Sequence, residues 1–144
     1  MTDTMIDVAF TGSRDDPNPW QLMTADCVLT YLWRIGYRRF HQGDCIGSDA
    51  RFAELARRQG YWIIAHPPTD ETRRAFYPAD EKRDPLPFAH RNAIIVHESS
   101  VGLATPLTDT RTAHSGSWST IAAMKARGIP HFIVGPTVMR RVDS

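Results

Sequence analysis

Residues 39–65 read RFHQGDCIGSDARFAELARRQGYWIIA, and the pattern of this segment indicates the fold class. It opens with Arg39–Gln42, which predicts a short strand that stops at a glycine. A helix with one apolar side follows between Gly47 and Gly60. Tyr61–Ala65 then predicts an apolar strand that ends before a His-Pro-Pro sequence. Strand, helix and strand in this order form a βαβ unit, so the two strands are expected to run parallel.

The same alternation continues in both directions along the chain. Further strands are predicted at Ile6–Thr11, Val101–Thr105 and Ile129–Val134. Further helices are predicted from Asn18-Pro19 to Gly36, from Pro87 to about Ser99, and over residues 117–127. The sequence therefore predicts an α/β protein with a Rossmann-like, doubly wound architecture: a mainly parallel five-stranded sheet with helices on both faces.

Length and composition fit one globular domain. The chain has 144 residues, which is typical of a single domain, so we expect one domain over residues 1–144 with a core at about 6–136. Hydrophobic residues make up 42% and charged residues 23% of the chain, which excludes a disordered or fibrous protein. The tail from Thr137 carries no pattern and is expected to fray.

Charge and targeting features narrow the function classes. A formal net charge of +1 argues against a strongly basic nucleic-acid binder. The chain has neither a long apolar run nor a signal-like N-terminus, and Cys27 and Cys45 form no CxxC motif. We therefore expect a cytoplasmic protein with reduced thiols and no membrane partner.

Residues 67–87 contain five prolines and many charges without clear periodicity. A segment of this length and composition is typical of a functional loop or a mobile lid. Phe76 and Tyr77 are candidates to close over a bound base, and anchoring of the loop is the alternative.

Small and polar residues gather where the predicted strands end and the helices begin. Ligands of open parallel sheets bind outside these strand ends, and helix N-termini near residues 48 and 117 would favour phosphate. Glycine there lets the backbone approach a ligand. The predicted ligand-binding residues are Gly12, Ser13, Arg14, Gly43, Asp44, Gly47, Ser48, Asp49, His66, Arg91, Asn92, Thr105, Ser115, Gly116, Ser117, Trp118, Ser119 and Thr120.

Several of these residues have a structural alternative. Arg14 could clamp a phosphate or lie on the surface, and Asp49 could bind a ribose hydroxyl or stabilise a helix start. Arg91 could bind an anion or form a buried ion pair. Asn92 could bond the ligand or the loop backbone. Trp118 could stack on a base, or pack against the sheet edge or a dimer mate.

The common nucleotide and hydrolase motifs are absent: TGSRDDP is not GxGxxG, and the chain has no GxxxxGK[ST], GxSxG or HExxH sequence. Two of the six histidines, His90 and His97, lie on one predicted helix about 10 Å apart by helical rise. Zinc needs ligands at about 2 Å, so this pair cannot share an ion. We therefore predict no metal site and no cofactor.

The ordered set of motifs resembles one superfamily. HQGDCIGSDARFAELARRQG is similar to the HGxxxGAD…A…G signature of SLOG-superfamily proteins, which are related to the lonely-guy phosphoribohydrolases and to the DNA-processing protein of transformation. SGSWSTIAAMKARGIP is similar to RSGTWxTIxxAxxxGxP of a small bacterial and phage branch. TGSR, HPP, RN at 91–92 and ATP fall in the expected order, over residues 6–136. The resemblance implies a doubly wound fold, a nucleotide or nucleotide-derived ligand and a homodimer.

The chain departs from this pattern at two points. The phosphoribohydrolases carry PGGxGTxxE, whose glutamate works in glycosidic cleavage, whereas His114 to Met124 contains no carboxylate here. Asp49, Arg91 and Glu98 are the remaining candidates for catalysis. His114 also replaces the arginine that precedes SGTW in the branch.

Three hypotheses follow. The missing glutamate favours a binding protein that senses, carries or sequesters a nucleotide-derived small molecule. The first alternative is a phosphoribohydrolase-like N-glycosidase that acts on nucleoside monophosphates. The second is a single-stranded DNA-binding protein, which the near-neutral charge disfavours.

Overall fold

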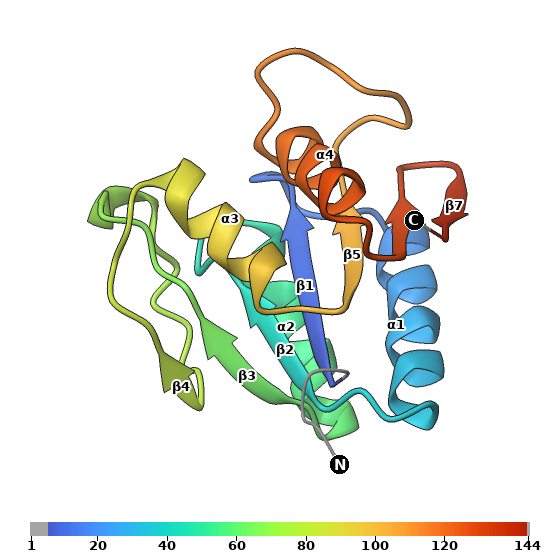
Figure 1. Cartoon of the computed structure of the whole chain (residues 1–144), viewed down its shortest axis with the longest axis horizontal. Helices are drawn as coiled ribbons and strands as arrows, with labels where there is room; N and C mark the ends of the chain where they lie inside the picture. Colours follow the sequence, from blue (N-terminus) through green and yellow to red (C-terminus); the bar gives the residue numbers. More distant parts are fainter. Residues whose placement is uncertain (1–5, 144) are drawn as a thin grey trace.

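A mixed sheet with strand order β4-β3-β2-β1-β5-β6-β7 forms the centre of the molecule (Figure 1). The computed structural model describes residues 6–143. The strands are β1 (Asp7–Gly12), β2 (Arg39–Gln42), β3 (Trp62–Ala65), β4 (Glu81–Lys82), β5 (Val101–Thr105), β6 (His131–Val134) and β7 (Met139–Val142). The helices are α1 (Pro19–Arg34), α2 (Ser48–Gln59), α3 (Phe88–His97) and α4 (Gly116–Arg127), with a short 3₁₀ turn, η2 (Glu71–Arg73). All strand pairs are parallel except β6 with β7.

The α/β class and the mainly parallel sheet are confirmed, but the predicted count of five strands is wrong, because the sheet has seven. Each predicted strand is present with boundaries shifted by two residues at most. The additional strands are the two-residue β4 and the C-terminal β7, which lie at the two edges of the sheet. β7 corrects the expectation of a frayed tail. It pairs with β6 through backbone hydrogen bonds, which need no apolar pattern.

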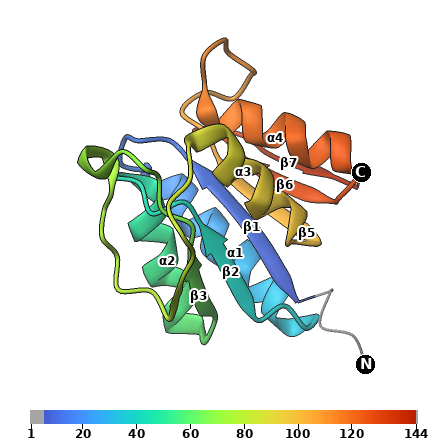
Figure 2. The same ribbon diagram turned by 60° about the vertical axis from the view of Figure 1, so that its left-hand side comes forward.

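The helices cover both faces of the sheet (Figure 2). Val8 and Phe10 of β1 belong to one hydrophobic cluster with residues of α1 and α2. The intervening Ala9 packs with residues of α3 and α4. Because successive side chains of a strand point to opposite faces, the two helix pairs lie on opposite sides of β1.

Segment 67–87 is tied to the edge of the sheet, which favours the anchoring alternative. Its backbone donates to the β3 strand from Asp80 and Arg83, over 3.0 Å to Ile63 and 2.9 Å to Ala65. Tyr77 is buried, and its hydroxyl donates to Glu54 of α2 over 2.9 Å. The proline-rich composition thus accompanies an anchored edge segment.

None of the described helices is long and apolar enough to cross a membrane.

Gln21 links the start of α1 to the centre of the sheet. Asn18 and Gln21 form a reciprocal capping box, so the predicted Asn-Pro helix start is confirmed. Gln21 is buried, and its Nε2 also donates to the carbonyl oxygens of Pro106 and Val134, over 2.9 Å and 3.1 Å. These carbonyls follow or end β5 and β6, so one side chain fixes α1 against both strands.

We expect Gln21→Ala to lower the free energy of unfolding by about 1–3 kcal/mol, because it leaves two buried carbonyls without their donor. Urea denaturation measures the loss. Met23→Ala, at an exposed position of the same helix, is the control and should change stability by less than about 0.5 kcal/mol. Equal effects of the two variants would contradict this role of Gln21.

Candidate functional site

The largest group of predicted ligand-binding residues lines one cavity beside the carboxyl ends of the strands. The strand order reverses between β1 and β5, which is where open α/β sheets bind ligands. A cavity of about 580 Å³ lies there. The predicted residues that line it are Gly12, Ser13, Arg14, Gly43, Asp49, Arg91, Asn92, Ser115, Gly116 and Ser117. They come from distant parts of the chain, as the sequence predicts.

Asp44 does not line this cavity. Its backbone adopts a positive φ of 53°, and its buried carboxylate accepts hydrogen bonds from Arg74 Nε over 3.0 Å and from the Tyr77 amide over 2.9 Å. Asp44 therefore anchors the edge segment, which in turn covers its charge.

The N-terminus of α2 is occupied by the protein itself. The Ser48 amide donates to the Ser13 carbonyl over 3.1 Å, and Ser48 Oγ donates to the Asp15 carbonyl over 3.2 Å. Gly47, with φ of 109°, lies so close to the Arg14 backbone that a Cβ atom would collide with it. These residues shape the loop after β1. The cavity is lined by the first residues of α4, by Phe88 at the start of α3 and by Asp49 in the first turn of α2.

His66 and Thr105 also lie outside the cavity lining. The His66 ring lies 2.8 Å from His41, and burial lowers the pKa of His66 to about 3, so the ring is neutral. Thr105 is buried, and its Oγ1 has no hydrogen-bond partner among the described residues.

Three of the predicted ligand-binding residues of α4 lie outside the cavity lining. Trp118 packs against the sheet in a cluster with Ala104 of β5 and Ile133 of β6. This favours the packing alternative for Trp118. Thr120 Oγ1 donates to the Gly116 carbonyl over 2.9 Å within the helix, and Ser119 is exposed.

Arg91 is the central charge of the site. It is buried, and its Nη1 donates to the carbonyl oxygens of Gly43 and of His66, the latter over 3.0 Å. Nε donates to Asn92 Oδ1 over 2.6 Å, so Asn92 bonds a side chain instead of loop backbone. No carboxylate of the described residues lies within ion-pair distance of Arg91, although Asp49 is close enough to act on it electrostatically.

Asp49 is the buried acidic residue of the cavity wall, and the exposed Asp15 lines the same cavity. Its Oδ2 accepts a hydrogen bond from the Cys45 amide over 2.9 Å, at the first turn of α2. Burial raises the pKa of Asp49 to about 6, although the Arg91 charge and the hydrogen bonds oppose the rise. Burial, with a contribution from Asp49, also raises the pKa of the Cys45 thiol, which therefore stays protonated and poorly nucleophilic.

Arg14 supplies a second cation to the cavity lining. It is exposed, lies 5.9 Å from the centre of the Phe88 ring, and forms no ion pair with the described residues. The first turn of α4 borders the same cavity, where Ser115 Oγ caps the helix by accepting from the Trp118 amide over 3.2 Å.

The structure adds apolar and loop residues that the sequence analysis missed, namely Ile46, Phe88, Leu107, Thr108 and Thr112. The loop between β5 and α4 contributes the last three and projects beyond the sheet (Figure 1). Ile46 and Leu107 are 54% and 60% exposed, and each follows closely after a predicted strand end. A solvent-exposed apolar residue in such a loop is the signal that could have identified them.

The three candidate catalytic residues do not share one cavity. Asp49 and Arg91 share the cavity, whereas Glu98, at the end of α3, lies in the lining of another cavity.

In the comparisons with known proteins, no family model, curated protein or solved structure matches this chain.

We expect Asp49→Asn to remove a pH dependence of stability. Because the pKa of Asp49 is raised to about 6 from 3.8, its ionisation costs more in the folded than in the unfolded chain. Wild-type stability should therefore fall as pH rises from about 4 to about 6, by up to roughly 3 kcal/mol from this group. The variant, measured by urea denaturation, should lack that decrease.

Asp70→Asn is the matched control, because Asp70 is an exposed carboxylate at the start of η2. It should keep the wild-type slope. An unchanged slope in Asp49→Asn would show that Asp49 has an ordinary pKa.

Proposed function

We propose that this chain binds a nucleotide or a nucleotide-derived small molecule in the cavity at the carboxyl ends of β1 and β2. One observation carries the proposal: Arg14, Arg91 and the first turn of α4 meet around a single cavity of about 580 Å³. Two cations and a helix N-terminus favour an anion, and the volume is within the usual range of small-molecule sites.

The phosphate end would lie between Arg14 and the start of α4. Arg14 is without an ion-pair partner among the described residues and can offer a planar pair of donors to phosphate. Gly12 lines the same cavity, and it must be glycine because a Cβ there would lie 2.6 Å from the Ser48 side chain and 2.7 Å from the Thr105 side chain. Ser117 and Gly116 would add main-chain amides of the α4 first turn.

The sugar and base would lie towards the deeper and the apolar walls. Asp49 and Asn92 offer oxygen acceptors for ribose hydroxyl groups. Phe88, Ile46 and Leu107 provide an apolar surface for a base. The resemblance to the SLOG superfamily supports a nucleotide-derived ligand. The interpretation of the sheet as doubly wound and Rossmann-like supports the same ligand class. A cytoplasmic homodimer remains part of this proposal.

Thermal denaturation with a panel of nucleoside monophosphates, ADP-ribose derivatives and cyclic nucleotides tests the proposal. A ligand at about 100 times its Kd adds about 2.7 kcal/mol to the stability of the folded chain, which raises Tm by several degrees. Arg14→Gln should weaken binding about tenfold or more, because charge-assisted bonds to phosphate are lost. Arg58→Gln, at an exposed arginine of α2 that lies outside the cavity, is the control and should bind like wild type.

A panel in which no compound raises Tm would contradict the proposal. So would a binding compound whose affinity is equal in wild type, Arg14→Gln and Arg58→Gln.

A second candidate function is N-glycosidic hydrolysis of a nucleoside monophosphate, and the buried Asp49 favours it. With a pKa of about 6, Asp49 is protonated in about half of the molecules at pH 6 and in about a tenth of them at pH 7. It could donate that proton to the departing base while water adds to the anomeric carbon. The products would be the free base and ribose 5-phosphate.

Incubation of the protein with nucleoside 5′-monophosphates and chromatography of the free base test this activity. We expect base release that decreases above about pH 6 and falls at least about 100-fold in Asp49→Asn, as typical of loss of a general acid. Glu98→Gln should retain activity, because Glu98 lies outside this cavity. No release from any nucleotide would remove the second candidate and leave the binding proposal standing.

A further inference from the structure

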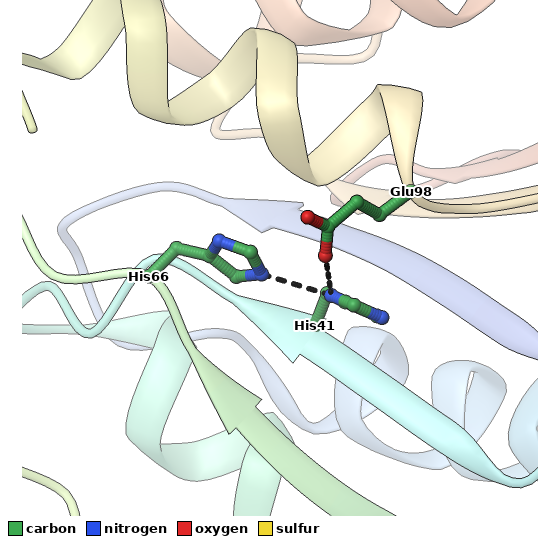
Figure 3. Close-up of side chains that lie close together, drawn as sticks. All are labelled: His41, His66 and Glu98. Atoms are coloured by element: carbon green, nitrogen blue, oxygen red, sulfur yellow. Dashed lines mark hydrogen bonds and ion pairs between the residues drawn. The ribbon is translucent and has the colours of Figure 1, made fainter. Parts of the chain in front are cut away.

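Two histidines and a glutamate meet on the α3 side of the sheet, away from the candidate nucleotide cavity. His41 belongs to β2, His66 follows β3, and Glu98 caps the end of α3. Figure 3 shows the three side chains directed towards one another. One ligand atom of each residue lies within 4.8 Å of the others. His41 Nδ1 is 2.8 Å from His66 Nε2 and 3.8 Å from Glu98 Oε1.

Asp7 fixes the orientation and the tautomer of His41. His41 Nε2 lies 2.8 Å from Asp7 Oδ1. Arg39 holds the same carboxylate in its ionised form, with Nε and Nη2 at 2.7 Å and 2.9 Å. An ionised carboxylate only accepts hydrogen bonds, so Nε2 of His41 carries a proton. A neutral His41 ring therefore presents the lone pair of Nδ1 to His66 and Glu98.

This arrangement places acceptors opposite each other. When the His41 ring is neutral, its Nδ1 lone pair and the Glu98 carboxylate, 3.8 Å apart, are both acceptors, and Glu98 Oε1 accepts from Arg83 Nη2 over 3.0 Å. His66 can supply a proton to His41, but not to Glu98 at the same time. A cation between the three atoms would satisfy all of them, and the Asp7–His41 contact is the carboxylate–histidine pair that supports histidine ligands of metals.

We propose that His41, His66 and Glu98 bind a divalent transition-metal ion, with zinc as the reference ion. Two imidazoles and one carboxylate are a ligand set that zinc uses in catalytic sites. Nitrogen ligands of a tetrahedral zinc at about 2.0 Å lie roughly 3.3 Å apart, so the two rings need to separate by about 0.5 Å. The Glu98 side chain, 32% exposed, can adjust by leaving Arg83, to which Oε1 is bonded over 3.0 Å.

The site would keep an open coordination position. His41 and Glu98 both line a second cavity, of about 760 Å³, to which Arg39, Arg83 and Arg127 also contribute. A water molecule or an anionic ligand from this cavity can therefore reach the ion. Three protein ligands and one exchangeable position distinguish catalytic from closed structural zinc sites.

Metal binding to the full-length protein tests the proposal. After chelator treatment and dialysis, isothermal titration with Zn²⁺ should give one site per chain. Co²⁺ should give the intense visible absorption of a low-symmetry site with nitrogen and oxygen ligands. Glu98→Gln and His66→Asn should each weaken Zn²⁺ binding at least about tenfold and reduce the Co²⁺ absorption.

Two matched variants separate the cluster from its surroundings. Glu81→Gln removes the other carboxylate that contacts Arg83 Nη2, at 3.1 Å, and His97→Asn removes an exposed histidine of α3 that lines the second cavity. Both should bind Zn²⁺ and Co²⁺ like wild type. Circular dichroism checks that each variant folds, and the partly exposed Glu98 position keeps the test valid if His66→Asn does not fold.

Absence of stoichiometric Zn²⁺ binding would overturn the proposal, and the cluster would then be a buried histidine–histidine hydrogen bond. Zn²⁺ binding that is equally strong in Glu98→Gln and Glu81→Gln would also overturn it. Neither outcome depends on nucleotide binding, because the cluster lies outside the first cavity.

Discussion

Both candidate sites depend on the hydrogen bonds of the buried Arg91 guanidinium. It joins α3 to the ends of β2 and β3 by donating to the carbonyls of Gly43 and His66. Residue 43 must be glycine, because a Cβ would lie 2.7 Å from Arg91 Cζ and 3.1 Å from Asp49 Oδ2. A buried cation without a hydrogen-bonded carboxylate is costly unless a nearby charge compensates it. Asp49 compensates part of that charge, and a bound anion would complete the compensation.

The same contact connects the cavity with the histidine cluster. Arg91 fixes the backbone of His66, while the His66 ring lies against His41 on the other side of the contact. On one side of Arg91 the protein offers cations and helix amides, which suit phosphate. On the other side it offers imidazole and carboxylate groups, which suit a metal ion. Arg91 thus lies between the candidate nucleotide cavity and the cluster of His41, His66 and Glu98.

Sequence patterns could predict the features that depend on local conformation, such as strand ends and helix starts. They missed the features that depend on strand register or on backbone pairing between strands. The glycines and serines at 12–13, 43 and 115–117 mark strand ends and a helix start, and they do line the cavity. Asp44 was predicted to bind the ligand but lies outside the cavity, where its backbone has a positive φ and its carboxylate accepts a hydrogen bond from Arg74. The His41 and His66 contact arises because β2 and β3 align His41 with Ile64, which places His66 on the same face. β7 has no apolar face, so only its pairing with β6 reveals it.

The most direct test of the central claim, that distant strand ends and the α4 start form one anion-binding cavity, is a residue-resolved NMR titration with nucleoside monophosphates. We expect saturable amide shifts concentrated at residues 12–14, at Gly43 and at residues 115–117, and we expect inorganic phosphate to shift the amides of residues 12–14 and 115–117. Amide shifts that cluster on another surface, or no shifts at millimolar nucleotide, would contradict it.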